Sequence, residues 1–431
     1  MFGARKNREQ EAGSAKPRWR PIVLASGITS GLRRNRQQEA GPATPRSRQS
    51  VLLIGGAVAL VVLMVIGGAL TWLFTSGGTG SSPASAAVKE HHARPAQPAV
   101  PVHVLSVTPA DAAHRVNGSR PVTITYSAPL AADSPTPSIT PAVQGTWTAA
   151  KGNTMVFTPA TAFKPDSTIT VRIPSGTSGV RTAAGGLLGT PVTVRFHTKS
   201  YSTLRLQELL ARLGYLPLTW KSKGSNPAAD DRAAQLRAAY NAPGGRFSWQ
   251  GNYPGSLTSL WAKGQANLID VGAIRAFESV EGLPMDGVAG PAVWRDLLRA
   301  VAKGQNNPAG YSYALASKGS PETLTVWHDG HVVLHTPANT GIAAAPTADG
   351  TYPVYLRMSF QIMKGTNPDG SHYADPVRNV AYFNGGDALH FFPRASFGFP
   401  QSLGCVELPL ASSAVAYRYM SYGSLVTVSP T

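Results

Sequence analysis

The sequence predicts a multidomain, mainly β fold that combines an N-terminal transmembrane helix, a β-sandwich, a small α-helical domain and a β-rich C-terminal domain. A chain of 431 residues is long enough for one to three ordinary domains. Its 44 glycines and 35 prolines, with only 14% charged residues, are typical of β-rich modules joined by turns and linkers. One long segment carries no charge at all, and it precedes many short runs of alternating polarity.

Residues 1–50 form a basic tail. They hold eleven lysines and arginines against three glutamates, a net charge of +8 out of +17 for the whole chain. Few large apolar residues and no helical period occur in this segment, so we expect it to be disordered. A strongly basic chain indicates an anionic partner, and the position of the charge decides which kind.

Residues 51–75 (VLLIGGAVALVVLMVIGGALTWLFT) are uncharged, with Trp72 near one end. Such a length spans a bilayer as a helix, so we expect a transmembrane signal anchor. Two alternatives are a buried core helix, which would show a polar stripe, and a cleavable signal peptide, which has a shorter apolar region. Residues 84–86 (ASA) offer a cleavage site for the second. The positive-inside rule predicts a single-pass membrane protein with residues 1–50 cytoplasmic and the rest extracytoplasmic. The remaining charge of +9 then favours polyanionic wall material over nucleic acid.

Residues 76–101 are rich in Gly, Ser, Ala and Pro and are predicted to be a linker, in which His91 and His92 are solvated. Over residues 102–199 short alternating runs follow, separated by turn-forming residues: VHVLSV, PVTITYS, GTWTAA, TMVFTP, STITVRI and TVRFHT. This spacing indicates a β-sandwich. The segment resembles bacterial immunoglobulin-like domains, which implies a role as a spacer or packing partner.

Residues 200–303 change to helical periodicity. Leu206, Leu209, Leu210 and Leu213 lie on one face of a helix that Gly214 ends. A second stripe, Val271, Ile274 and Phe277, ends at Gly282 and Pro284, and Gly290-Pro291 open a third helix.

The runs LQELLARLGYLP and AIRAFESVEGLPMDGVAGPAVWRDLL resemble the three-helix peptidoglycan-binding domain, here with an insertion at about 217–268. The resemblance implies glycan binding. The insertion holds Trp220, Trp249 and Trp261, which either stack on sugar rings or pack within the domain.

Residues 310–431 are β-rich again. ETLTVW and HVVLHT flank Asp329-Gly330, a hairpin signal. His328, His331 and His335 suggest zinc, but strands leading away from a tight turn do not bring them together, and no carboxylate or cysteine completes a set. We therefore expect neither a metal nor a cofactor.

Cys405 is the only cysteine of the chain. An isolated cysteine is either a small buried hydrophobe or a nucleophile that needs a base. Gly404 before it allows an unusual backbone and a close approach of substrate. His390 ends an apolar run fifteen residues upstream, so a loop can bring the two side chains together. Spacing alone leaves both readings open.

The segment YFNGGDALH, ending at His390, and the segment SLGCVELP, residues 402–409, resemble the L,D-transpeptidase catalytic domain of the YkuD type over the last ~120 residues. The resemblance implies a peptidoglycan L,D-transpeptidase that forms 3→3 cross-links, with L,D-carboxypeptidase activity when water is the acceptor. Cys405 would be the nucleophile and His390 the general base and acid. Backbone N–H groups around Gly404, with Ser402, would stabilise the oxyanion and position the thiol.

The same resemblance implies peptidoglycan stem peptides and glycan strands as partners, inhibition by carbapenems, and a lid over residues 358–380. Tyr373, Phe391 and Leu403 are candidate substrate contacts. Leu403 and Glu407 depart from the family motif, where His and Arg or Asn are usual. Because a glutamate disfavours a thiolate, they raise the alternative of a non-catalytic or impaired wall-binding scaffold. A sortase, a third option, needs an arginine beside the thiol, and none follows Cys405.

Overall fold

The computed structural model describes residues 99–150 and 152–430, which belong to one compact unit, His91–Thr431. No helix of these residues is long and apolar enough to cross a membrane. The longest of them, α4 (Leu268–Glu281), has 14 residues, whereas a bilayer requires about 20.

This finding contradicts the transmembrane helix of the predicted fold class, the predicted single-pass membrane location and the membrane contact that depends on it. The fold class of the described residues is multidomain and mainly β. Residues 51–75, which carry those predictions, lie outside the described residues, as do the basic tail 1–50 and residues 76–98 of the linker.

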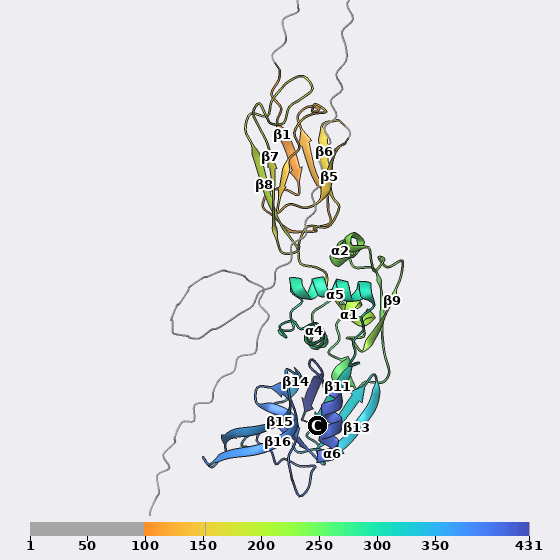
Figure 1. Ribbon diagram of the computed structural model, residues 1–431, viewed down its shortest axis with the longest axis vertical. Coiled ribbons are helices and arrows are strands. Elements are labelled where there is room, and N and C mark those ends of the chain that lie inside the picture. Colours follow the sequence, from red (N-terminus) through yellow and green to blue (C-terminus); the bar gives the residue numbers. More distant parts are fainter. Residues whose placement is uncertain (1–98, 151, 431) are drawn as a thin grey trace, which may run out of the picture. The chain divides into compact units, whose positions relative to one another are not determined.

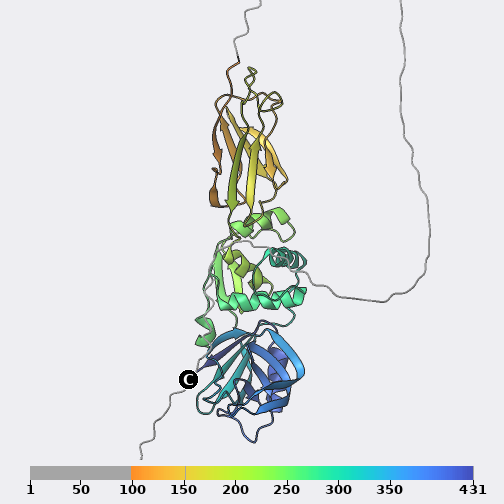
Figure 2. The same cartoon turned by 90° about the vertical axis from the view of Figure 1, so that its left-hand side faces the viewer.

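Residues 104–198 form two four-stranded sheets, ordered β1-β3-β6-β5 and β2-β8-β7-β4 (Figures 1 and 2). Their strands are β1 (Val104–Thr108), β2 (Ala113–Val116), β3 (Val122–Tyr126), β4 (Ser138–Thr140), β5 (Gly145–Ala150), β6 (Thr154–Pro159), β7 (Thr168–Ile173) and β8 (Val192–Thr198). In β3 the side chains of Val122, Ile124 and Tyr126 are buried, whereas those between them are half-buried. This period of two fills a core between the sheets, and the predicted β-sandwich is confirmed. The short strands β2 and β4 were not predicted.

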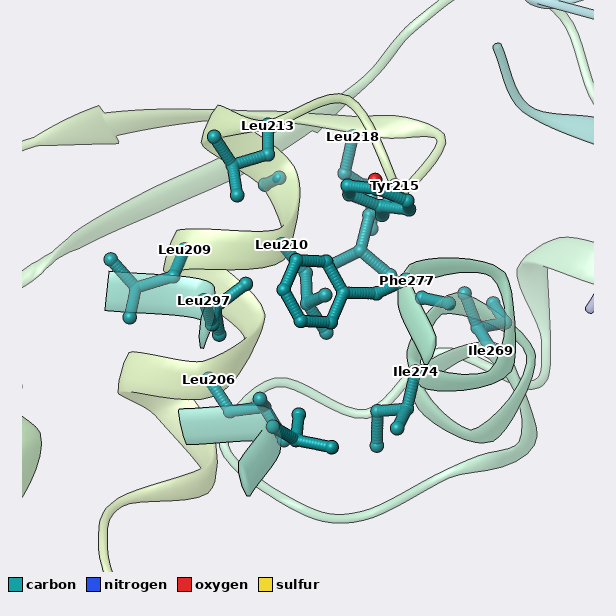
Figure 3. Close-up of a cluster of buried hydrophobic side chains, with 14 of the residues drawn as sticks. Leu206, Leu209, Leu210, Leu213, Tyr215, Leu218, Ile269, Ile274, Phe277 and Leu297 are labelled. Atoms are coloured by element: carbon teal, nitrogen blue, oxygen red, sulfur yellow. The ribbon is translucent and has the colours of Figure 1, made fainter. Parts of the chain in front are cut away.

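The helical domain contains α1 (Thr203–Arg212), α4 and α5 (Pro291–Lys303). Leu206, Leu209 and Leu210 of α1 are buried and meet Phe277 of α4 and Leu297 of α5 in one core (Figure 3). The predicted ends are confirmed, because the chain turns into the left-handed region at Gly214 (φ 75°) and Gly282 (φ 66°).

The predicted insertion folds onto this core. It contains β9 (Leu218–Ser222), α2 (Arg232–Tyr240), β10 (Gly245–Trp249) and α3 (Gly255–Thr258), and β9 pairs with β10 as an antiparallel hairpin. Trp220, Trp249 and Trp261 are half-buried and pack against the helical core. Phe247 lies 4.7 Å from the ring of Trp220 and 5.0 Å from that of Trp261, centroid to centroid. The three rings thus pack within the domain, and stacking of their exposed parts on sugar rings stays a prediction.

The C-terminal domain has a five-stranded sheet ordered β13-β12-β11-β19-β14 and a four-stranded sheet ordered β15-β16-β17-β18. Its strands are β11 (Ser312–Ser317), β12 (Thr323–His328), β13 (His331–Pro337), β14 (Gly350–Pro353), β15 (Leu356–Thr366), β16 (His372–Asn384), β17 (Asp387–Phe391), β18 (Val406–Leu408) and β19 (Leu425–Ser429). Helix α6 (Leu410–Tyr419) lies against β13, β16 and β17 (Figure 1). The long strands β15 and β16 form a hairpin that extends from the four-stranded sheet.

The hairpin predicted at Asp329-Gly330 is confirmed, with φ values of 45° and 79° in its turn. Its histidines have other partners: His328 Nδ1 lies 3.0 Å from Ser312 Oγ, and His335 Nδ1 lies 2.9 Å from Thr325 Oγ1. In the part of the chain that the structure describes, no three His, Cys, Asp or Glu side chains are placed to hold a metal ion.

Backbone of the helical domain touches backbone of the C-terminal domain at Gly272 and Gly423. A Cβ atom on Gly272 would lie 2.5 Å from the carbonyl oxygen of Gly423, so neither position has room for a side chain. Tyr313 and Leu425 of the C-terminal sheet belong to the same buried cluster as the helices. The two domains therefore share part of one core.

Candidate active site

Strands β17 and β18 run parallel and bring the predicted nucleophile and base to one face of a sheet. His390 pairs with Glu407, and Leu389 pairs with Val406. Cys405 directly precedes β18, and because side chains alternate along a strand it faces the same side as Glu407 and His390. The sequence suggested that a loop joins the two side chains. The pair of parallel strands does so instead, and the loop 392–404 is the connection that parallel pairing requires.

His390 and Cys405 both line a cavity of about 540 Å³. One wall comes from alternate residues of the β15–β16 hairpin, among them Gln361, Met363, Tyr373, Asp375 and Val377. The opposite wall comes from β17, β18 and the loop between them, including Ser402, Leu403 and Glu407. The hairpin therefore forms one side of the cavity that the thiol faces.

His390 is held in one tautomer. Its side chain is 3% exposed, and Nδ1 lies 2.9 Å from the carbonyl oxygen of Phe391. A carbonyl only accepts hydrogen bonds, so Nδ1 carries the proton and Nε2 of the neutral ring keeps a free lone pair. Burial lowers the pKa of His390 below its usual 6.5, although the hydrogen bond to Phe391 and the charge of Glu407 act the other way. At neutral pH the imidazole is therefore a proton acceptor.

Cys405 is half-buried, and its Sγ lies 3.7 Å from the carbonyl oxygen of Gly386. Burial raises the pKa of the thiol to about 12, and the charges of Asp387 and Glu407 act in the same direction. Among the hydrogen bonds of residues 99–150 and 152–430, none joins the thiol to His390. The resting site therefore holds a protonated thiol and a neutral imidazole, not a thiolate–imidazolium pair.

The turn before Cys405 is held by Ser402 and requires Gly404. Ser402 Oγ donates to the carbonyl oxygen of Cys405 at 2.5 Å and accepts from the N–H of Gly404 at 3.3 Å. Thr347 Oγ1 donates to the same carbonyl at 3.3 Å. Gly404 has φ 116°, and a Cβ there would lie 2.7 Å from Asp387 Oδ1. Both the conformation and the close carboxylate exclude a side chain at position 404.

The candidate substrate contacts do not all face the cavity. Tyr373 and Leu403 line it, and the Leu403 side chain is exposed. Phe391 is not among the lining residues; it contributes the carbonyl that fixes His390, whereas the following residue, Phe392, lines the cavity. Alternation along β17 accounts for this, since Phe391 and His390 project to opposite faces.

Arg394 is a site residue that the sequence reasoning missed. Its Nε and Nη2 donate to the two carboxylate oxygens of Glu407, each at 2.7 Å. In the sequence, Glu407 has no evident counter-charge, because no arginine follows Cys405 in the motif. The available signal was the single arginine within the loop that joins His390 to Cys405.

Comparison with known proteins identifies one domain directly. The family model described as a bacterial Ig-like domain matches residues 98–198, whereas no curated protein matches the chain. The peptidoglycan-binding role of residues 200–303 stays a prediction.

Solved structures similar to the chain include an L,D-transpeptidase from Mycobacterium smegmatis, at 16% identity and TM-score 0.26, covering 77% of this chain and 100% of that one. L,D-transpeptidase 3 from Mycobacterium tuberculosis, solved with a faropenem-derived adduct, has 16% identity and TM-score 0.25, covering 75% and 97%. The catalytic domain of the E. faecium L,D-transpeptidase has 24% identity and TM-score 0.26, covering 27% and 96%. These three solved structures are L,D-transpeptidases, and residues 98–198 contain a bacterial Ig-like domain.

Proposed function

We propose that the chain is a peptidoglycan L,D-transpeptidase that works through a cysteine thioester and forms 3→3 cross-links. One observation carries the proposal: Cys405 and His390 project from adjacent parallel strands onto one sheet face and line the same cavity. Acyl transfer through a covalent intermediate requires a nucleophile and a base that both reach the bound substrate, as two residues that line one open cavity can. The motifs around both residues supply the substrate class.

In the first step, Cys405 Sγ attacks the carbonyl of the diamino-acid residue at position three of a stem peptide. The thiol proton passes to Nε2 of His390 as the S–C bond forms, because the free protein holds a protonated thiol and a neutral imidazole. The tetrahedral oxyanion accepts hydrogen bonds from backbone N–H groups around Cys405, and the N–H of Gly404, which donates to Ser402 Oγ in the free protein, turns to it only if it leaves that hydroxyl. The C–N bond then breaks, His390 returns the proton to the leaving amine, and terminal D-alanine departs.

In the second step, the amine of another stem peptide attacks the thioester. His390 takes a proton from that amine, the C–S bond breaks, and the proton returns to the sulfur. The product is a 3→3 cross-link. When water is the acceptor, the same sequence gives L,D-carboxypeptidase activity.

The walls of the cavity support the recognition of a donor peptide. The hairpin presents Tyr373 and Asp375, and the opposite wall presents the apolar side chain of Leu403. A cavity of about 540 Å³ falls in the range of small-molecule sites and accepts several residues of a stem peptide. Leu403, where the family has histidine, makes this part of the site apolar.

The second candidate function is a wall-binding scaffold without catalysis. The raised pKa of Cys405 favours it, because a thiol with a pKa of about 12 is almost entirely protonated near pH 7. The two candidates differ in whether the thiol ever forms a thioester.

The test is incubation of residues 99–431 with disaccharide-tetrapeptide and, separately, with a carbapenem, followed by mass spectrometry of the intact protein. The transpeptidase predicts free D-alanine from the first, and from the second an adduct on Cys405 with the full mass of the carbapenem, since ring opening loses no atoms. Cys405→Ala abolishes both, and His390→Gln slows both about 10²- to 10⁴-fold. A wild type that behaves like Cys405→Ala in both assays would establish the scaffold.

A further inference from the structure

Arg394 and Glu407 form a bidentate ion pair inside the candidate site. Both N–O distances are 2.7 Å, and the Glu407 side chain is only 6% exposed. Arg394 Nη2 also donates to the carbonyl oxygen of Gln401 at 3.1 Å, and the guanidinium stacks on Phe392 at 4.7 Å from the ring centroid. Arg394 therefore joins β18 to two distant points, Phe392 and Gln401, of the loop 392–404.

Glu407 is placed where a lone carboxylate would be harmful to a cysteine nucleophile. It pairs with His390 in the register of β17 and β18, projects to the same face as Cys405, and lines the same cavity. A buried carboxylate without a partner is costly, and its charge opposes a second negative charge nearby. Reaction of Cys405 creates such a charge, first on sulfur and then on the oxyanion.

We propose that Arg394 is a positioning residue of this site, whose guanidinium neutralises Glu407 so that Cys405 and His390 face an ion pair and not a net negative charge. The inference rests on the proposed function only in its choice of Cys405 as the reacting group. Burial is the largest cause of the raised pKa of Cys405, and the Glu407 charge adds to it. At His390, Glu407 and Arg394 act in opposite directions on the pKa, as expected of a pair that largely cancels.

The arrangement also explains how the chain tolerates its departure from the family motif. Glu407 stands where the resemblance leads to an expectation of Arg or Asn. The guanidinium comes instead from the loop, and its planar fork matches the two carboxylate oxygens. The charge of Glu407 is thereby balanced from a different point of the chain.

Other charged and titratable groups line the same cavity as the thiol and stay constant in the test. They are Tyr373, Asp375 and Tyr382 from β16, Asp387 and His390 from β17, and Lys364 from β15. Variants confined to positions 394 and 407 therefore change one pair against a fixed background.

The experiment measures the rate of Cys405 alkylation by iodoacetamide from pH 6 to 10, a reaction that needs the thiolate but no peptidoglycan. The variants are Arg394→Gln, Arg394→Lys, Glu407→Gln and the double variant Arg394→Gln/Glu407→Gln. Arg378→Gln, on the exposed side of β16, controls for the loss of one positive charge. Thermal midpoints report whether each variant is folded.

We expect Arg394→Gln to slow alkylation about three- to tenfold near pH 8. A shift of one to two pKa units lowers the thiolate fraction ten- to a hundredfold, and the higher nucleophilicity of the more basic thiolate offsets about half of that on a logarithmic scale. The double variant should return to within about twofold of wild type, and Arg394→Lys should stay close to it, because each restores the local charge balance.

Two results would overturn the proposal. Alkylation of Arg394→Gln at the wild-type rate would show that Glu407 does not act on the thiol. A double variant as slow as Arg394→Gln would show that Arg394 only ties down the loop. If Arg394→Gln does not fold, the double variant and Arg394→Lys still decide between charge and structure. Because iodoacetamide is the probe, failure of transpeptidation would leave these rates intact, and the two hypotheses fail separately.

Discussion

Substitution of Gly404 by alanine tests whether the turn before Cys405 is as constrained as its geometry indicates. Gly404 has φ 116°, and a Cβ atom would lie 2.7 Å from Asp387 Oδ1. A non-glycine residue in that backbone region costs about 1–3 kcal/mol. Asp387 must also move, which weakens its hydrogen bonds from Asn384 Nδ2 at 3.2 Å and the N–H of Ala348 at 3.4 Å. Both bonds are weakened and not lost, so together they cost about as much as one hydrogen bond, about 1 kcal/mol, and the total is about 2–4 kcal/mol.

The matched control is Gly385→Ala in the turn between β16 and β17. Gly385 also has a positive φ, 53°, but a Cβ there would meet nothing within 4 Å. Its cost is therefore the backbone term alone, about 1 kcal/mol. Both variants place an alanine at a positive φ, a conformation that costs more at 116° than at 53°, and only Gly404→Ala adds the collision with Asp387.

The assays are urea unfolding and the rate of carbapenem adduct formation on Cys405. We expect Gly404→Ala to lose about 1–3 kcal/mol more than Gly385→Ala. It should also acylate at least tenfold more slowly than wild type, because displacement of a nucleophile by about 1 Å costs up to 10²-fold. Gly385→Ala should acylate at nearly the wild-type rate. Equal stability of the two variants, with unchanged acylation of Gly404→Ala, would refute this account of the turn.

Three further predictions follow from the site and the domain junction. The rate of acylation should stay constant from pH 8 to below pH 6.5 and fall only as His390 protonates, because burial lowers the pKa of His390 in the folded protein. The unfolded chain binds that proton more readily, so the free energy of unfolding should also fall as the pH drops below 6.5. A kcat/KM profile and urea titrations check both. Alkylation of wild-type Cys405 should still rise steeply between pH 8 and 10, and a plateau near pH 8.5 would contradict a thiol pKa of about 12. Gly423→Ala should lower the thermal midpoint several degrees more than Gly282→Ala. Both glycines have a positive φ, but only Gly423 lies against the backbone of Gly272 in the other domain. Equal midpoints would contradict close backbone packing between the two domains.

Local patterns predicted the elements whose stability is mainly local. The leucine stripe of α1 ends at Gly214 as its spacing indicates, and the strands of the sandwich follow the alternating runs. The strands β2 and β4 were missed because they have only four and three residues, too few for a period of two to stand out in the sequence. Strand β9 was missed because its pairing with β10 spans a helix, and no local pattern records a partner more than twenty residues away.

The same limit applies to the site. Cys405 and His390 were identified from their types and their neighbours, yet the parallel pairing of β17 with β18 was not. Arg394 was not predicted, because its partner Glu407 lies 13 residues further along the chain and only the conformation of the loop brings the guanidinium to that carboxylate. Charge compensation is a property of the folded arrangement, so the sequence showed the glutamate without showing what balances it.

The protonated state of Cys405 has a consequence for its chemical durability. Peroxides and disulfides react with thiolates, and their rates follow thiolate character and exposure. A half-buried S–H group directed at the carbonyl of Gly386 presents little of either. Under the proposed function, the residue would thus resist irreversible oxidation in the free protein and become nucleophilic only when a bound peptide places its carbonyl beside the Cys405–His390 pair. The protonated state that slows reaction of Cys405 with oxidants then also restricts its reaction to a bound peptide.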